Sequence, residues 1–353
     1  MPVVAVVAAL LLGALIIAFA GLNPLRAYAA LARGAFGSVG SFSETLVRFC
    51  PLALCALGVL VAFRAGFFSI GADGQFYLGA LAATFVALKV PALPSIVLVP
   101  LCMAGAMAAG TLWALVAGLL KVRLGVNEVV STIMLNAIAS LLIDFLVRGP
   151  LRAPGTDLQY TAVIPKFAWL PRILPHTRLH AGVFLPLIAA LLVYIFLWRM
   201  SAGFDSRVTG ANSVAARHAG INVGGSVLGA VAISGALAGL AGAVEIQAVF
   251  HRLQAGIGSD YGYTAIPIAL VGKTLPGATL LAALIFAALG VGSAMMQIKA
   301  SVPSPLVVLL QGLIILFVVG SDMFVPKLRK WRQTLPPETT SGNLPPMDPS
   351  IAE

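Results

Sequence analysis

Apolar runs of about 20 residues recur along the chain, and this feature constrains its fold more than any other. A helix of that length crosses the hydrocarbon core of a bilayer with its backbone hydrogen bonds satisfied internally. Composition agrees, because 60% of the 353 residues are hydrophobic and only 10% are charged. Soluble domains carry roughly a quarter charged residues. The sequence therefore predicts an all-α polytopic membrane protein.

The apolar runs mark about ten candidate transmembrane helices, which together form one domain, residues 1–324. The candidate spans cover residues 3–20, 45–63, 75–88, 93–118, 126–147, 181–198, 226–249, 262–272, 277–296 and 304–320. The remaining tail, 325–353, is rich in Pro, Ser and Thr beyond a basic anchor. We expect this tail to be cytoplasmic and largely disordered.

Clusters of Lys and Arg orient the spans, because cytoplasmic loops carry an excess of these residues. One cluster is Lys121 with Arg123, a second lies in the loop 199–225, and a third follows the last span. Placing all three inside puts both termini in the cytoplasm and the segment 148–180 outside. That segment also holds five Lys and Arg residues, which conflicts with the rule, although long loops follow it less strictly. We expect a multi-pass protein of the cell (inner) membrane.

Two candidate spans are too short to cross a bilayer alone, and both follow a polar, glycine-containing stretch. Residues 75–88 follow the stretch 71–76, and residues 262–272 follow the stretch 258–263. Each is third in a set of five spans, and the two sets enter the membrane from opposite sides. This pattern predicts a 5+5 inverted repeat with short broken helices at the solute pathway of a transporter.

Several other classes of function are disfavoured by the sequence. The net charge of +10 comes from loop residues and forms no basic face with interleaved aromatics, so we expect no nucleic-acid partner. The three cysteines and four histidines are dispersed, and we expect neither a metal nor a cofactor. Gly272-Lys273-Thr274 resembles the end of a phosphate-binding loop, but Pro267 stands at its first glycine position. The chain is thus expected to be no enzyme, and ATP hydrolysis would belong to a separate chain.

Polar and aromatic residues within the spans are candidates for the solute pathway, because polar groups at membrane depth are costly. The candidates are Asp73, Gln75, Phe76, Asn136, Glu245, Gln247 and Tyr263. For Asp73 we expect first a gating role, in which its carboxylate accepts the free N–H groups of its own short helix. Direct contact with the solute is the second interpretation.

The other candidates leave alternatives open. Asn136 would pair with a sugar hydroxyl or a base edge, or would cross-link two helices. Glu245 would accept ribose hydroxyls, or would pair with His251 or Arg252. Phe76 and Tyr263 would stack on a base, or would serve only in packing.

The loop 204–225 is rich in small residues and has mixed polarity. Within it, Gly220 lies four residues after the Ala215-Ala216 pair. These features suit a short amphipathic helix that docks in a groove of a cytosolic partner. A plain solvated loop is the alternative, and composition alone favours it.

Four stretches resemble the permeases of ATP-binding cassette (ABC) importers, in the group that handles branched-chain amino acids, ribose and nucleosides. They are FRAGFFSIGADGQ (63–75), GVNEVVSTIMLN (125–136), RVTGANSVAARHAGI (207–221) and GYTAIPIALVGKTLPGA (262–278). The resemblance runs from the first span to the last and is closest to the nucleoside and simple-sugar permeases. The chain departs from the family pattern at Ser69 and Asp73, where the family usually has Asn and Glu.

This resemblance implies a permease subunit that translocates nucleosides or a related small polar solute and carries no chemistry itself. The partners it implies are cytosolic ABC ATPase subunits, a second identical or homologous permease subunit, an extracytoplasmic solute-binding protein and membrane lipid. It also implies that the 207–221 stretch couples to the ATPase. The coupling residues would be Arg207, Asn212, Ala215, Ala216 and Gly220.

Two alternatives to nucleoside import remain. The same architecture could carry branched-chain amino acids or a monosaccharide. A different class, an ion-coupled secondary transporter, also uses inverted repeats.

Overall fold

The computed structural model of the protein describes residues 2–90, 93–155, 157–258, 260–303, 305–310, 312–313, 316–317 and 320, with side chains from residue 7 onward. Within this part of the chain the secondary structure is helical. Two isolated bridges, Tyr160 with Gln254 and Arg172 with His180, are its only β pairings. The predicted tail 325–353 lies outside the described residues, and the predicted last span lies only partly within them.

The helices follow one another with short connections, except at one long segment between α6 and α7. The α-helices are α1 (Pro2–Phe19), α2 (Pro24–Phe36), α3 (Val39–Arg64), α4 (Ala72–Lys89), α5 (Ser95–Leu124), α6 (Glu128–Arg148), α7 (Leu185–Arg199), α8 (Ser201–Ala211), α9 (Ser213–His218), α10 (Val223–Glu245), α11 (Tyr261–Val271) and α12 (Pro276–Ala300). Two short 3-10 turns, η1 (Lys166–Ala168) and η2 (Ala181–Phe184), lie in or end the long segment, and a π-helical turn, η3 (Ile246–Phe250), extends α10.

Six helical stretches are long and apolar enough to cross a membrane. They are Val39–Arg64, Ser95–Leu124, Glu128–Arg148, Ala181–Arg199, Val223–Phe250 and Pro276–Ala300. Val7–Phe19 and Tyr261–Val271 are shorter apolar helices. The helices therefore agree with the predicted polytopic membrane protein, while the total of ten spans and the inverted repeat stay predictions.

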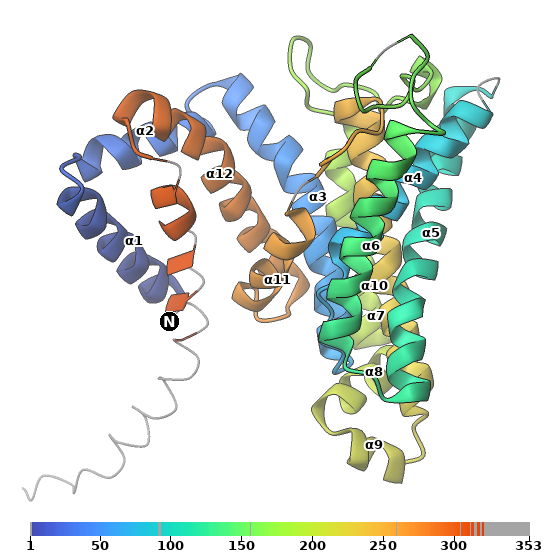
Figure 1. The fold of residues 1–353 in the computed structure, drawn as a ribbon. Coiled ribbons are helices and arrows are strands. Elements are labelled where there is room, and N and C mark those ends of the chain that lie inside the picture. Colours follow the sequence, from blue (N-terminus) through green and yellow to red (C-terminus); the bar gives the residue numbers. More distant parts are fainter. Residues whose placement is uncertain are drawn as a thin grey trace, which may run out of the picture.

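The helices gather in two groups that α3 and α11 connect. Figure 1 shows α1, α2 and α12 on one side and α4 to α10 on the other. The 148–180 segment covers one end of the larger group, and α8 and α9 lie at its opposite end (Figure 1). The smaller group has its own apolar core, which includes Ala27 of α2 and Met296 of α12.

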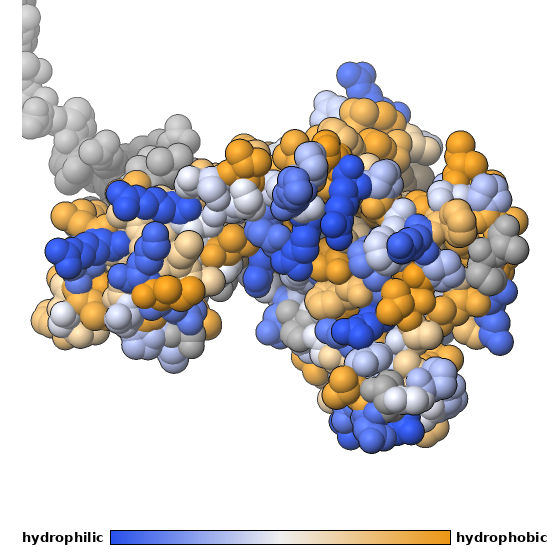
Figure 2. All heavy atoms as spheres, turned by 90° about the horizontal axis from the view of Figure 1, so that it is seen from above, coloured by the Kyte–Doolittle hydropathy of each residue, from blue (hydrophilic) through white to orange (hydrophobic). Residues whose placement is uncertain are grey.

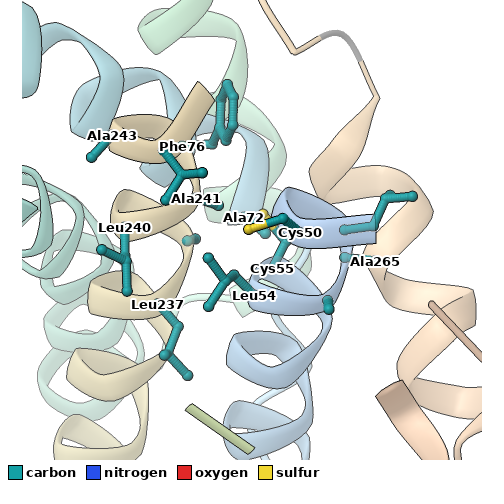
Figure 3. Close-up of a cluster of buried hydrophobic side chains, with 14 of the residues drawn as sticks. Cys50, Leu54, Cys55, Ala72, Phe76, Leu237, Leu240, Ala241, Ala243 and Ala265 are labelled. Carbon is teal, nitrogen blue, oxygen red and sulfur yellow. The ribbon is translucent and has the colours of Figure 1, made fainter. Parts of the chain in front are cut away.

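The core of the larger group forms around α10, whose small residues let neighbouring backbones approach closely. A Cβ added at Gly239 would collide with the carbonyl of Ala106 in α5, and one added at Gly242 would collide with that of Phe76 in α4. Figure 3 shows part of this core, where side chains of α10, α3 and α4 meet. The glycines of α10 thus set how closely α4 lies against the centre of the fold.

Two features of the fold differ from the sequence-based expectations. The helix predicted at 75–88 is α4, and its 18 residues span about 27 Å, close to the ~30 Å of a hydrocarbon core. It is longer than predicted because the polar turn from Ala72 to Gln75 is helical, whereas α11 is as short as predicted. The sequence reasoning also missed α2, whose Asn23 caps the helix by accepting hydrogen bonds from Leu25 and Arg26.

Candidate functional site

The first turns of α4 and α11 meet end to end, although they are far apart in sequence. The carboxylate Oδ1 of Asp73 accepts a hydrogen bond of 2.6 Å from the backbone N–H of Gly262. From this meeting point α4 runs towards the end that carries the 148–180 segment, and α11 runs towards the opposite end (Figure 1). Because the N-terminus of a helix carries a partial positive charge, a carboxylate is stabilised there. The two helices therefore share one anionic group.

Asp73 does not cap its own helix, so this part of the sequence-based expectation is wrong. The N-cap of α4 is Gly71, which has no side chain and so cannot cap the helix through one. The free N–H of Gly74 instead donates to Oδ1 of Asn136 in α6, at 2.8 Å. Since Asp73 lies inside the first turn and only 4% of it is exposed, its side chain reaches sideways to α11 rather than back to its own amides.

Asn136 connects three segments of the chain. Its amide nitrogen donates to the carbonyl of Ile70 at 2.8 Å and to the hydroxyl of Tyr263 at 3.3 Å. Its oxygen accepts from Gly74, as described above. Both amide hydrogens are thus used. In this conformation the side chain holds α6, the entry to α4 and α11 together, and it has no donor left for a solute.

Glu245 lies at the end of α10, buried to 3% exposure. Its Oε1 accepts a hydrogen bond of 3.2 Å from the hydroxyl of Tyr261, the first residue of α11. Neither of the partners expected from sequence takes this role. His251 stacks on Trp169 at 3.8 Å between ring centroids, and Arg252 lies over the ring of Tyr160.

Two buried amide side chains have an oxygen without a hydrogen-bond partner among the described residues. Gln75, in the first turn of α4, is 3% exposed, and Gln247, in the π-helical turn, is 0% exposed. The nitrogen of Gln247 donates to the carbonyls of Val99 and Ala168. The indole N–H of Trp113, beside Gly74, is likewise unpaired. Most buried polar atoms in folded proteins form a hydrogen bond, so these three groups are exceptions.

The two candidate aromatic residues differ in accessibility. Phe76 is fully buried and contacts Tyr261 edge-on, with ring centroids 5.8 Å apart. Tyr263 is 42% exposed, and its hydroxyl is held by Asn136. Tyr263 is therefore the candidate whose ring is open to contact from outside the chain.

The predicted coupling residues lie together at the opposite end from the 148–180 segment, on and beside the short helix α9. Asn212 caps this helix by accepting hydrogen bonds of 3.0 Å from Val214 and Ala215. Ala216 is fully buried, whereas Ala215 is exposed. Gly220 follows the helix with φ +81°, a conformation that glycine adopts readily and other residues rarely do.

Arg207 lies on the preceding helix, α8, with its guanidinium over the rings of Trp198 and Phe204. A groove of about 850 Å³ runs beside these helices, lined by the ends of α3 and α5 and the start of α10. Lys121 and Arg217 are among its lining residues. The chain thus presents a structured surface here instead of a plain solvated loop.

Sequence reasoning missed Gly262, Tyr261 and Trp113 as members of the site. Gly262 contributes only a backbone N–H, and a Cβ at this position would collide with the backbone of Asp73. No local pattern indicates such a contact. Tyr261 could have been found, because it opens the second short helix one residue after the acidic Asp260.

These features define a class of protein: a helical membrane transport protein, with a polar site where two helices begin and a structured surface at one end. The chain belongs to the family described as branched-chain amino acid transport system / permease component, whose model matches residues 41–319. It is the permease subunit of an ABC importer.

Curated relatives match along nearly the whole chain. A glucose ABC transporter permease of Haloferax volcanii is 35% identical, over 92% of this chain and 87% of its own length. A guanosine ABC transporter permease of Bacillus subtilis is 34% identical, over 91% and 92%. A nucleoside ABC transporter permease of Lactococcus lactis is 31% identical, over 93% of each chain. No solved structure matches the chain.

Proposed function

We propose that this permease subunit translocates nucleosides, or a closely related small polar solute, into the cytoplasm. The observation that carries the proposal is the similarity to permeases named for guanosine and for nucleosides, which extends over more than nine-tenths of both chains. The glucose permease of similar identity supports a monosaccharide as the second candidate. Branched-chain amino acids, from the family description, are the third.

The solute pathway runs past the meeting point of α4 and α11. The hydrogen bond from Gly262 to Asp73 closes the pathway there, and Asn136 holds the surrounding segments in register. An exposed aromatic ring at Tyr263 offers a flat apolar surface for a nucleobase or a sugar face. Opening of the pathway separates the two helix ends and frees the carboxylate of Asp73 for solute hydroxyls.

The meeting of two helix ends from opposite directions supports ten spans in a 5+5 inverted repeat, with both termini in the cytoplasm and 148–180 outside. Under this topology α8 and α9 are cytoplasmic. A separate ABC ATPase docks on them, at the 199–225 loop, and powers transport. A second permease subunit completes the pathway, and an extracytoplasmic binding protein delivers the solute.

The proposal is tested by uptake into proteoliposomes that contain the chain with its ATPase and binding protein. Radiolabelled guanosine, uridine, glucose and leucine are compared, with and without ATP. We expect ATP-dependent accumulation of the nucleosides, with no competition from leucine. Accumulation of glucose alone would favour the monosaccharide. Uptake without ATP, driven by a proton or sodium gradient, would contradict the proposal and support an ion-coupled transporter.

A further inference from the structure

Two arginines at the end of the molecule that carries α8 and α9 have no carboxylate partner. Arg64 ends α3 and Arg207 lies on α8, and neither forms an ion pair with any described residue. At the other end, by contrast, Arg178 is neutralised by Glu44. Figure 2 views that other end and shows its hydrophilic side chains gathered near the centre of the face. Arg64 and Arg207 are therefore positive charges that the described part of the chain leaves uncompensated.

The guanidinium groups of these two arginines lie over the same aromatic ring. Their central carbons are 5.4 Å (Arg64) and 5.7 Å (Arg207) from the ring centroid of Trp198, at the end of α7. Arg207 also lies 5.9 Å from the ring centroid of Phe204. Attraction to a ring face holds a cation in place but does not neutralise its charge. Because the two like charges repel one another, an anion bound here would stabilise both.

The hydrogen bonds of the two arginines are also incomplete. Nε of Arg64 donates to the carbonyl of Thr274, in the turn between α11 and α12, at 3.0 Å. Nε of Arg207 is buried and has no hydrogen-bond partner among the described residues. A guanidinium carries five N–H donors in one plane, so contact with a ring face leaves the donors on its edges available. Such donors match the oxygens of a phosphate group.

The cluster lies where two membrane spans end. Arg64 is the last residue of the span Val39–Arg64, and Trp198 is the last but one of the span Ala181–Arg199. Tyr194, one turn earlier in α7, is exposed, and its ring stacks on that of Trp198 with centroids 5.4 Å apart. Tyr and Trp gather where the hydrocarbon core meets the headgroups. The cluster therefore lies at the depth of lipid phosphates.

An apolar stripe of α7 leads along the membrane to this cluster. Leu187 and Leu191 are both more than half exposed. They precede Tyr194 and Trp198 at spacings of four, three and four residues, which place all four side chains on one face of the helix. A lipid whose acyl chains lie along this stripe has its headgroup beside Trp198.

Acidic groups of the protein itself are less suited to this cluster than a lipid. Asp205 lies two residues before Arg207, on a different face of α8, where it lines a separate pocket. Glu128, at the same end of the molecule, already pairs with Lys121 at 2.6 Å. A second copy of the chain therefore brings little free negative charge here from its described residues. Arg207 is also not among the residues that line the groove beside α9.

We propose that Arg64 and Arg207 bind the phosphate of an anionic phospholipid, in the leaflet next to α8 and α9, with its acyl chains along α7. An anionic headgroup is favoured over a zwitterionic one because it brings no positive charge towards the arginines. Since Arg64 also holds the carbonyl of Thr274, a bound lipid would steady the turn that ends α11. The first turn of the same helix contacts Asp73, so the lipid site is connected to the meeting point of α4 and α11.

The test is lipid binding to the purified permease complex in detergent, measured by native mass spectrometry without solute or ATP. The probes are phosphatidylglycerol and phosphatidylcholine with identical acyl chains. We expect the wild type to bind phosphatidylglycerol at least about tenfold more tightly. Arg207→Gln and Arg64→Gln, tested separately, should each reduce this preference to about threefold or less, and a glutamine at position 64 still offers a donor to Thr274. Binding of phosphatidylcholine should stay near the wild-type level, which shows that the fold is kept.

The matched control is Arg199→Gln, at the same membrane depth. Arg199 follows Trp198 directly and is exposed, but its guanidinium is not one of those over the ring. It should keep the wild-type preference, and an equal loss in this control would overturn the inference in favour of general surface charge.

Three further outcomes would overturn the inference. The first is a preference for phosphatidylglycerol that persists in both site variants. The second is release of the ATPase by Arg207→Gln with lipid binding unchanged, which would assign this arginine to the ATPase. The third is displacement of the lipid by an equal concentration of inorganic phosphate, which would indicate a site for a soluble anion. Because no solute is present, none of these outcomes depends on the proposed function.

Discussion

The carboxylate of Asp73 in α4 and the backbone N–H of Gly262 in α11 lie 2.6 Å apart, across 189 positions of sequence. Each residue belongs to the first turn of its helix, so the bond joins two helix starts that approach from opposite directions. The arrangement puts one negative group where two partial positive charges converge. It is also easily broken, because it depends on one side chain. These properties suit a gate, and the first two predictions concern it.

Removing the carboxylate should impair transport in steps. Asp73→Asn keeps an oxygen acceptor but loses the charge, and we expect uptake to fall severalfold. Asp73→Leu loses both, and uptake should fall further, by about two- to thirtyfold, since a carboxylate at a helix start contributes roughly 0.5–2 kcal/mol and 1.4 kcal/mol corresponds to a factor of ten. Uptake is measured at equal amounts of inserted protein. A wild-type rate in Asp73→Leu would refute the gating role.

The close approach of the two helix ends should depend on the absence of a side chain at position 262. In Gly262→Ala, the new Cβ would collide with the backbone of Asp73, so the two helix starts must separate. We expect lower thermal stability of the purified protein and lower uptake. The control is Gly277→Ala in the first turn of α12, where an added Cβ meets nothing within 4 Å. Equal melting temperatures for the two variants would contradict this account.

Asn136 and Tyr263 should differ in importance for stability. Asn136→Ala removes three hydrogen bonds, to Ile70, Gly74 and Tyr263, whereas Tyr263→Phe removes one bond and keeps the ring. A buried backbone group left without its partner costs about 1–3 kcal/mol. We therefore expect a clear fall in melting temperature for Asn136→Ala and a small one for Tyr263→Phe. Equal melting temperatures for the two variants would show that Asn136 does not hold these segments together as described.

Much of this structure could be predicted from the sequence, because the lipid bilayer places simple constraints on the segments that cross it. Long apolar runs between charged residues predicted α3, α5, α6, α7, α10 and α12, since only helices satisfy the backbone in lipid. Gly220 predicted the end of a short helix in the 204–225 loop, and this helix is α9, whose start at Asn212 was not predicted. The helix α2 was missed because it has only 13 residues and two arginines interrupt it, so it forms no long apolar run.

The partners within the site could not be predicted from a single sequence. Asp73 was identified as important, yet its contact is a backbone N–H, and every residue except proline offers one. Tyr261 was overlooked beside Glu245 because the distance between them in space depends on the course of the chain through η3 and residues 251–258. Patterns in a sequence identify polar residues that are unfavourable to bury in a membrane, but the packing of the helices decides which of them come into contact.

The 148–180 segment should lose its attachment at acidic pH. Burial, together with the neighbouring His251, lowers the pKa of His180 to about 4. The ordinary value of about 6.5 applies when the segment detaches. The detached form therefore binds a proton first, so the attachment is fully stable above pH ~6.5 and weakens as the pH falls towards 4.

Hydrogen exchange of residues 161–181 measures this effect. Protection should decrease between pH ~6.5 and 4, and His180→Gln should reduce the change. A residual dependence is expected, because burial and the charge of Arg172 also lower the pKa of His251. Protection that stays constant over this range in the wild type would show that neither histidine controls the attachment.

The last prediction concerns the surface formed by α8 and α9. Gly220 has φ +81°, a conformation in which a β-branched residue is strongly strained. Gly220→Val should therefore displace the end of α9 and abolish association with the ATPase, while membrane insertion and the melting temperature of the remaining fold stay near the wild type. The matched control is Gly229→Val in α10, where the backbone is helical and an added Cβ meets nothing within 4 Å. Co-purification of the ATPase with each variant measures the outcome. Because the control makes the same chemical change without the backbone strain, loss of the ATPase from both variants would point to a general defect, and retention in both would place the docking site elsewhere.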